Sequence, residues 1–201
     1  MKITEIKRKS HSKNIYLVYV DNSFFAQMLD ESIVKFNLKS GQCYEKEFLE
    51  NSRTESLNPL ALHHCLNVLD RSIKTKKQIL SYLKEKGFEK QTDFVIEKLE
   101  KYRLIDDVKY AEAYVSSHKN KGKKALWFEL KIKGVDEEII KNVLSQITNQ
   151  EDVIFLLAKK FLKNKTLDAQ TKQKLFRHLA NKGFEFDEIN TCISQIFKKE
   201  K

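Results

Sequence analysis

Apolar residues recur three times along the chain in a pattern that ends at a glycine. Each copy has two adjacent apolar residues, a leucine three positions later, and then Lys-Gly followed by one more apolar residue. The copies occupy residues 79–88, 126–135 and 175–184, so their glycines are 47 and 49 positions apart (134 − 87 and 183 − 134). A repeat period of about fifty residues indicates an array of similar supersecondary units.

The spacing inside each copy predicts one helix and the place where it ends. Apolar residues at positions i, i+1 and i+4 lie on one face of a helix. The glycine can adopt the left-handed conformation that closes a helix, and the lysine before it suits the negative end of the helix dipole. The apolar residue after the glycine can then fold back onto the helix. One copy could be an αα-turn that recurs by chance, whereas three copies in register favour a true repeat.

The first 57 residues have a different pattern. Residues 15–20 mix alternating apolar positions with β-branched and aromatic side chains, as strands do. We predict, in order, strands at 2–8, 14–20 and 24–27, short helices at 30–38 and 45–50, and a polar linker at 52–56. Such a segment is too small to be assigned as an independent domain.

From Asn58 onward the apolar spacing is helical throughout. Asn58 and Pro59 are the residue types that cap and begin a helix. Thr75 followed by Gln78 has the form of a capping box. Further helix N-caps are predicted at Asp106, Asp136, Asn149, Asp168 and Asp187. These signals divide the region into nine helices, in three sets of three.

The predicted fold class is therefore mainly α: an elongated tandem array of three three-helix repeats, preceded by a small N-terminal β-hairpin with short strands and helices. The repeats are predicted at residues 58–104, 105–148 and 149–201, and the N-terminal segment at residues 1–57. One set of three short helices buries too little apolar surface to be stable alone. Neighbouring sets are therefore expected to stack along a continuous apolar seam.

The net charge of +10 is concentrated in the helical region. Residues 1–57 hold 9 basic and 8 acidic side chains, a balance of +1, whereas residues 58–201 hold 29 and 20, a balance of +9. A polyanion is the expected partner, and nucleic acid is the commonest polyanion. The alternative is a lysine-rich proteome, in which basic surfaces are ordinary.

Composition also excludes several classes of protein. No run of eighteen apolar residues could span a membrane, and the first residues lack the apolar segment of a secretion signal. We therefore expect a cytoplasmic protein with no membrane partner. The isolated cysteines Cys43, Cys65 and Cys192 lack metal-binding spacing and are expected to be reduced.

No group of residues predicts catalysis or a cofactor. His63, His64 and Cys65 are adjacent on a helix and point in different directions, so they cannot hold one metal ion together; we expect one buried and one exposed histidine. Asp106 and Asp107 open a helix, where capping explains them better than metal binding does. The sequence has no glycine-rich phosphate loop, nucleophile elbow or zinc-protease motif. We expect no enzyme activity, no metal and no cofactor.

Basic side chains cluster at similar places in the repeats. The clusters at residues 71–77 and 119–124 lie where a motif helix begins, and the cluster at 159–165 precedes the last motif helix. Together with backbone N–H groups exposed at the helix N-termini, these side chains are expected to contact phosphates without reading bases. The candidate contacts for DNA or a protein partner are Arg71, Lys74, Lys76, Lys77, Lys119, Lys121, Lys123, Lys124, Lys131, Lys159 and Lys163. The alternative is that these side chains lie in solvated loops.

Four of these lysines, at positions 76, 77, 123 and 124, are the strongest candidates for DNA. Two aromatic residues of the same region, Tyr110 and Trp127, each fall on an apolar stripe. We therefore assign them to the core rather than to base stacking.

Several of these motifs occur together in one known family. The sequence resembles the RecX family over residues 60–201, through Ile79-Leu80 and Leu83 with Lys86-Gly87, Leu104-Ile105-Asp106-Asp107 with Tyr110-Ala111 and Tyr114-Val115, and Glu129-Leu130 with Lys133-Gly134-Val135. The N-terminal hairpin is similar to that of members from low-GC bacteria. The combination at these spacings is specific, although each motif alone is weak.

The resemblance implies a regulator of the RecA recombinase that is not an enzyme. Family members bind single- and double-stranded DNA and the RecA filament, restrain filament growth, and so suppress ATP hydrolysis and strand exchange. We expect a monomer that lies in the groove of the protein–DNA filament. Two departures stand out: His118 replaces a frequent arginine, and Asp187 lies two residues farther from its glycine than Asp136 does.

The sequence leaves two other functions open. One is a nonspecific DNA-binding protein without a RecA partner, which would affect RecA only by competing for DNA. The other is an adaptor whose helical repeats bind a protein, in which case the positive charge would be incidental.

Overall fold

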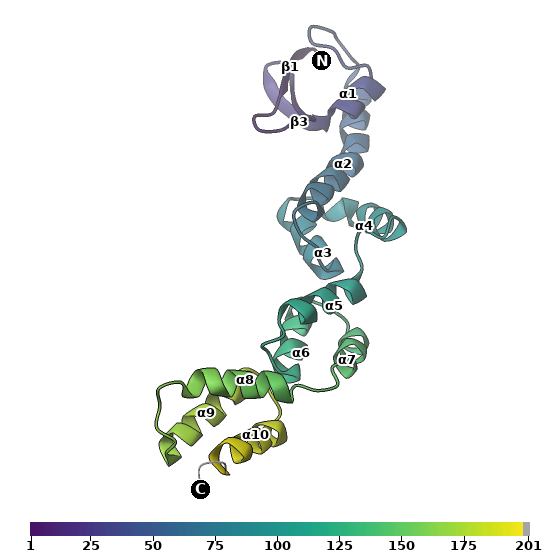
Figure 1. Cartoon of the computed structure of the whole chain (residues 1–201). Helices are drawn as coiled ribbons and strands as arrows, with labels where there is room; N and C mark the ends of the chain where they lie inside the picture. Colours follow the sequence, from purple (N-terminus) through teal and green to yellow (C-terminus); the bar gives the residue numbers. More distant parts are fainter. Residues whose placement is uncertain (199–201) are drawn as a thin grey trace. The chain divides into compact units, whose positions relative to one another are not determined.

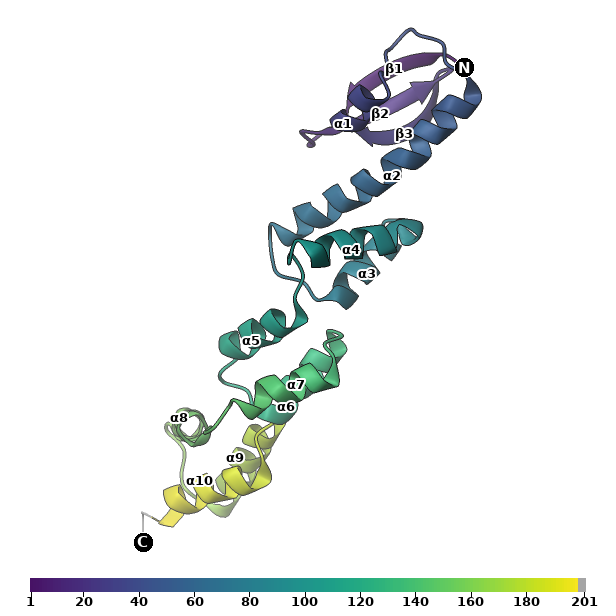
Figure 2. The same ribbon diagram turned by 90° about the vertical axis from the view of Figure 1, so that its right-hand side faces the viewer.

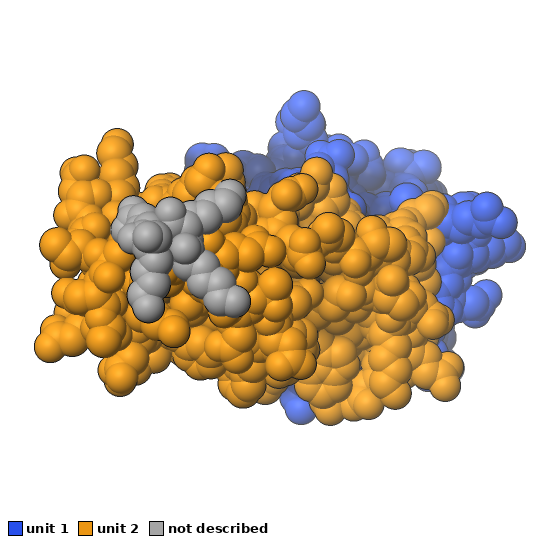
Figure 3. Space-filling view, turned by 60° about the horizontal axis from the view of Figure 1, so that its bottom comes forward, with its two compact units in different colours: residues 1–73, 79–104 blue, residues 74–78, 105–201 orange. Residues whose placement is uncertain are grey.

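The computed structural model describes residues 1–198. They form ten α-helices, one short 3-10 helix and a three-stranded sheet, so the prediction of a mainly helical fold with a small N-terminal β segment is confirmed. The chain divides into two compact units (Figure 3): unit 1 contains residues 1–73 and 79–104, and unit 2 contains residues 74–78 and those from 105 onward. None of the helices in the described range is long and apolar enough to cross a membrane.

Three antiparallel strands form the sheet of unit 1, in the order β1 (Ile3–Arg8), β2 (Ile15–Val20) and β3 (Ser23–Leu29). All three predicted strands are confirmed, and the third is longer than predicted at both ends. Figure 2 shows the strands beside α2 (Lys46–Leu69), and β3 contacts that helix. Ile3 and Met28 of the sheet share a buried apolar cluster with Leu49 of α2.

The long helix α2 contradicts the sequence prediction for residues 45–59. A short helix, a polar linker and a new helix beginning at Asn58 and Pro59 were expected, but residues 46–69 form one helix of 24 residues with Pro59 inside it. The reason is a buried stripe at positions 49, 52, 56 and 60, in which serines occupy two of the core-facing positions. The Ser52 hydroxyl donates to the Leu49 carbonyl at 2.8 Å, and the Ser56 hydroxyl to the Ser52 carbonyl at 2.6 Å. Small buried serines thus continue a stripe that looks polar in the sequence.

A short helix, α1 (Asp30–Lys35), lies between β3 and α2, where a short helix was predicted at residues 30–38. Unit 1 is completed by most of α3 (Lys76–Glu85), the 3-10 helix Glu89–Gln91 and α4 (Thr92–Lys101). Because α2 crosses residues 57 and 58 without a break, no loop separates the N-terminal segment from the first repeat. The division of the helical region into repeats at 58–104, 105–148 and 149–201 stays a prediction.

The three motif helices α3, α6 (Lys123–Ile132) and α9 (Ala169–Asn181) end in the same way. Their glycines, Gly87, Gly134 and Gly183, have φ angles of +77°, +87° and +82°, which confirms the predicted left-handed turns. In each turn the next residue donates its N–H to a carbonyl five positions earlier: Phe88 to Leu83, Val135 to Leu130 and Phe184 to Leu179, at 2.8, 3.1 and 3.4 Å. Those next residues are buried, so each chain segment folds back onto the helix it has left.

Most of the predicted helix caps are confirmed. The Thr75 hydroxyl accepts from the Gln78 N–H at 3.2 Å, while the Gln78 side chain accepts from the Thr75 N–H at 3.1 Å, which completes a capping box. The carboxylates of Asp106, Asp136 and Asp168 each accept from backbone N–H groups in the following turn. The cap predicted at Asn149 is one residue too early, because Gln150 is the N-cap of the helix that begins at Glu151, although the Asn149 side chain accepts from the Glu151 N–H at 2.7 Å.

The cap predicted at Asp187 is wrong. Helix α10 (Phe186–Lys198) begins one residue earlier, and the Glu185 N–H donates to the Glu188 carboxylate at 3.2 Å. Helix α7 (Glu137–Ser145) begins three residues after Gly134 (137 − 134), and α10 begins three residues after Gly183 (186 − 183). The distance from the glycine to the next helix is therefore the same in the second and third repeats. The two extra residues expected in the third repeat followed from placing the helix cap at Asp187.

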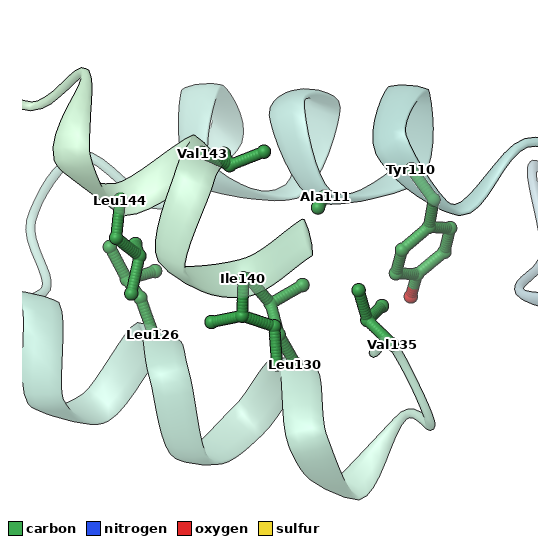
Figure 4. Packing of buried hydrophobic residues seen from close by; sticks show 8 residues of the cluster. All are labelled: Tyr110, Ala111, Leu126, Leu130, Val135, Ile140, Val143 and Leu144. Atoms are coloured by element: carbon green, nitrogen blue, oxygen red, sulfur yellow. The ribbon is translucent and has the colours of Figure 1, made fainter. Parts of the chain in front are cut away.

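Unit 2 contains two separate apolar clusters. The first lies among α5 (Asp107–Ser117), α6 and α7, whose buried side chains point toward one another in Figure 4: Tyr110, Ala111, Leu126, Leu130, Val135, Ile140, Val143 and Leu144. The second lies among α8 (Glu151–Leu162), α9 and α10, which form one group in Figure 1. The predicted continuous apolar seam is therefore wrong for this pair of helix sets.

The two helix sets of unit 2 meet through backbone instead. Gly122, just before α6, donates its N–H to the Lys182 carbonyl at 2.8 Å, and the Lys124 N–H donates to the Gly183 carbonyl at 3.1 Å. A side chain on Gly122 would overlap the backbone of Gly183, and one on Gly183 would overlap Ala125. The glycine that ends α9 thus also leaves room for the start of α6 to approach closely.

The same contact recurs at the start of α3. Residues 74–78 belong to unit 2, and there the Thr75 hydroxyl donates to the Lys133 carbonyl at 2.7 Å. A side chain on Gly134 would overlap the side chain of Lys77. In both cases the first residues of one motif helix lie on the glycine turn that ends the next motif helix.

This geometry predicts that alanine substitutions at equivalent glycines have unequal effects. Gly87→Ala should lose about 1–2 kcal/mol of the free energy of unfolding, because the left-handed conformation disfavours a Cβ while no atom lies within 4 Å of it. Gly183→Ala should lose roughly 1–3 kcal/mol more, because its Cβ also meets the Ala125 backbone. Urea unfolding followed by circular dichroism measures both; equal losses would contradict the proposed role of close approach.

Candidate nucleic-acid interface

The first basic cluster lies around the start of α3. Lys76 and Lys77 are exposed, and Lys74 is half-buried. The Lys76 backbone N–H donates to the Asp107 carboxylate at 2.9 Å, and the side chain of Lys77 passes Gly134. Arg71 is exposed in unit 1, where it lines a separate pocket.

The second cluster lies around the start of α6. Lys119 is exposed, whereas Lys121 lies 2.5 Å from a carboxylate oxygen of Glu129. Lys124 lies 2.7 Å from a carboxylate oxygen of Glu185 and its ammonium is 4.7 Å from the Phe186 ring centroid. Two of the predicted phosphate contacts are thus held in ion pairs.

The remaining candidates belong to α6 and α8. Lys131 lies 2.5 Å from a carboxylate oxygen of Glu137, and its ammonium is 4.7 Å from the ring centroid of Trp127. Lys159 is exposed in the last turn of α8, with its ammonium 4.7 Å from the Phe155 ring centroid. Lys163 follows that helix and is exposed.

The backbone N–H groups at these helix starts are already used, contrary to the sequence prediction. At α6, the N–H groups of Gly122, Lys123 and Lys124 donate to Lys182, the Gln150 side chain and Gly183. At α3, the N–H groups of Lys76 and Gln78 donate to the side chains of Asp107 and Thr75. Most of these backbone N–H groups donate to the neighbouring helix set, so they are not available to a phosphate. Phosphate binding would therefore depend on side chains.

A hydrogen-bonded network holds Lys121 near α5. Glu129 accepts from the Tyr114 hydroxyl at 2.9 Å and from the Lys121 ammonium. Burial, reinforced by the hydrogen bond to Glu129, raises the pKa of Tyr114 to about 12. Burial acts to raise the pKa of Glu129, but the hydrogen bonds from Lys121 and Tyr114 outweigh it and lower that pKa. The carboxylate is therefore ionised and binds Lys121 at neutral pH.

His118, one of the two departures from the family pattern, is the C-terminal cap of α5 and contacts Tyr114. Its ring stacks on Tyr114 with centroids 4.0 Å apart, and its Nδ1 lies 2.8 Å from the Tyr114 carbonyl oxygen. The imidazole is thus engaged in closing the helix.

A groove on α6 and α7 was missed by the sequence reasoning. It has a volume of about 510 Å³ and is lined by Lys123, Lys124, Trp127, Phe128, Lys141, Leu144, Ser145 and Glu185. Tyr110 is buried as predicted, whereas Trp127 is half-buried: it packs against the core cluster and also lines the groove. The sequence did contain a sign of this groove. Lys123 and Trp127 are four positions apart, as are Lys124 and Phe128, and residues at that spacing are neighbours on a helix surface.

The histidine pair of α2 lies in unit 1. His63 and His64 are both half-buried, so the expectation of one buried and one exposed ring is wrong. Burial and the nearby charge of Lys9 lower the pKa of His64. Both histidines line a polar pocket of about 450 Å³ with His11 and Arg71. Among the described residues, no group of three or more histidine, cysteine or acidic side chains is placed to hold a metal ion.

Comparison with known proteins places this helical chain in a family. Models of the second and third three-helix domains of RecX match residues 106–144 and 149–193. A regulatory protein RecX of Clostridium perfringens is 32% identical over 207 residues, which cover 99% of this chain and 98% of that protein. The chain belongs to the RecX family. A regulatory protein RecX of Bacillus licheniformis is 29% identical, over 96% of this chain and 76% of its own length.

Two solved structures agree with this assignment to RecX. A crystal structure of regulatory protein RecX superposes with a TM-score of 0.67 and 25% identity, covering 98% of both chains. A crystal structure of RecX from Lactobacillus salivarius gives a TM-score of 0.64 and 28% identity, covering 69% of this chain and 96% of that one. The family is one of regulatory proteins and is not a known family of enzymes.

The Glu129 network predicts a pH-dependent contribution to stability. Because its pKa is lowered in the folded protein, ionised Glu129 stabilises the fold at neutral pH, and this stabilisation is lost as the pH falls below the ordinary value of 4.5. Glu129→Gln should therefore reduce the free energy of unfolding by about 1–2 kcal/mol near pH 7, with a smaller difference in acid. Urea unfolding near pH 7 and at a pH below 4.5 measures the free energy of unfolding of both proteins. The control is Glu112→Gln, at an exposed position of α5. A difference independent of pH would contradict the assignment.

Proposed function

We propose that the protein regulates the RecA recombinase by binding its DNA filament, and that it mostly inhibits filament growth, ATP hydrolysis and strand exchange. The observation that carries this proposal is similarity to regulatory proteins named RecX over nearly the whole chain. The protein would act in the cytoplasm as a monomer, with no cofactor and no chemistry of its own.

The arrangement of unit 2 supports binding as the mode of action. Its helix sets are joined by backbone hydrogen bonds, and the helical region of the chain carries a balance of +9. A basic surface neutralises phosphates, and its affinity falls steeply with salt. The division into three-helix units at 58–104, 105–148 and 149–201 belongs to this proposal.

Three of the candidate cations lie in ion pairs with carboxylates. Lys121, Lys124 and Lys131 each have a carboxylate within 2.7 Å, so contact with a phosphate must compete with that partner. Lys76, Lys77 and Lys123 are the other strong candidates, and we expect their side chains to contact phosphates near the starts of α3 and α6. Arg71, Lys74, Lys119, Lys159 and Lys163 complete the proposed set.

Charge reversal tests the proposal. Lys76→Glu, Lys77→Glu and Lys123→Glu together should weaken DNA binding and abolish inhibition of RecA ATP hydrolysis on single-stranded DNA. The slope of log affinity against log salt should fall by roughly 0.7–0.9 for each lost phosphate contact. The matched control reverses Lys39, Lys46 and Lys90, exposed lysines of unit 1, and gives the same net charge of +4 (10 − 6).

A pull-down of RecA without DNA separates the rival functions. Capture of RecA supports a filament regulator. DNA binding without capture of RecA, and no effect on ATP hydrolysis beyond competition for DNA, would indicate a nonspecific DNA-binding protein. Full activity of the triple reversal would instead indicate an adaptor in which the charge is incidental.

A further inference from the structure

The groove between α6 and α7 combines two kinds of side chain, basic and aromatic. Its volume of about 510 Å³ lies within the range of 300–1,000 Å³ that is typical of ligand sites. Lys123, Lys124 and Lys141 supply positive charge, and Trp127 and Phe128 supply aromatic rings. All of these residues belong to unit 2, so the groove lies within one compact unit.

One aromatic ring of the groove is exposed, and the other is held in place beside it. Phe128 is 60% exposed, although it is a large apolar side chain on a well-packed helix. Trp127 is half-buried, and its ring is braced by the core cluster on one side and by the Lys131 ammonium. An exposed phenylalanine next to a braced indole loses little conformational entropy when a flat ligand stacks on it.

The charges of the groove favour an anion. Three of the lining residues are lysines, and Glu185 is the one carboxylate among the described lining residues. Glu185 is neutralised by Lys124 at 2.7 Å, which leaves Lys123 and the exposed Lys141 facing a lining without a second acid. A ligand that fits must carry both negative charge and flat unsaturated rings, and a nucleic acid strand has both.

We propose that this groove binds single-stranded nucleic acid by stacking a base on Phe128, beside Trp127, while Lys123 and Lys141 contact the adjoining phosphates. The faces of bases in a duplex are covered by their neighbours, so the groove selects single strands over duplexes. Stacking tolerates any base, so no sequence preference is expected. This inference rests on the proposed function and adds the strand type and the residues that recognise it.

The single tryptophan of the chain makes the test direct, because Trp127 lies in the groove itself. A homopyrimidine oligonucleotide should quench its fluorescence on binding, whereas a duplex of equal charge should bind more weakly and quench less. Phe128→Ala should weaken oligonucleotide binding by roughly 5- to 150-fold, the equivalent of one lost base stack. Phe128→Tyr, which retains the ring, should restore most of the affinity.

Two control variants separate stacking from a general loss of apolar surface. Ile132→Ala removes a side chain that is 62% exposed on the same helix, and Leu156→Ala one that is 69% exposed on α8. Neither residue lines the groove, so both variants should bind the oligonucleotide as the wild type does. Circular dichroism checks that each variant is folded.

The outcomes distinguish this inference from the proposed function. Oligonucleotide binding with unchanged Trp127 fluorescence, and equal affinity for Phe128→Ala, would overturn the stacking groove and leave DNA binding intact. Absence of any oligonucleotide binding would overturn both. If Phe128→Ala abolished capture of RecA without changing the affinity for the oligonucleotide, the groove would be a protein-binding site and the inference would be wrong.

Discussion

The close contact between the start of one motif helix and the glycine turn that ends the next is the constraint on which unit 2 depends. It requires a residue without a side chain at Gly122 and Gly183, because each would place a Cβ on the backbone of the other segment. It also supplies hydrogen bonds from Gly122 and Lys124 to the carbonyls at the end of α9. Gly183 therefore has two tasks, since it adopts a left-handed conformation and also makes room for a neighbour. Two small cores that are separate from each other are joined in this way without a continuous apolar seam.

This mode of joining has a consequence for binding. A helix N-terminus normally offers N–H groups to an anion, but here the neighbouring helix set or a side chain accepts them. The positive potential of the chain must therefore act through its lysine side chains. Their surroundings differ: Lys121 is held by a half-buried network with Glu129 and Tyr114, whereas Lys119 and Lys141 are exposed. A count of lysines in the sequence cannot separate these groups, because the carboxylates that hold them lie on other turns or other helices.

Under the proposed function, the protein acts by occupying a binding surface on its target. In that case the aromatic and basic side chains on α6 and α7 would recognise an open strand, while the lysines at the start of α3 would need only a phosphate backbone. Stacking depends little on salt and phosphate contact depends strongly on it. The two surfaces would therefore dominate under different ionic conditions.

The sequence by itself determined the repeat, the left-handed glycine turns, most of the helix caps and the strands of unit 1, because these depend on residues within a few positions of one another. It failed at Ser52 and Ser56, where two small polar residues continue a buried stripe, and at Asp187, where the helix begins one residue earlier. Only the tertiary structure decided which lysines are paired, which backbone donors are used, and that Trp127 lines a groove as well as packing on the core. Those properties depend on residues that are far apart in the sequence, such as Lys124 and Glu185, and no local spacing reports the distance between them.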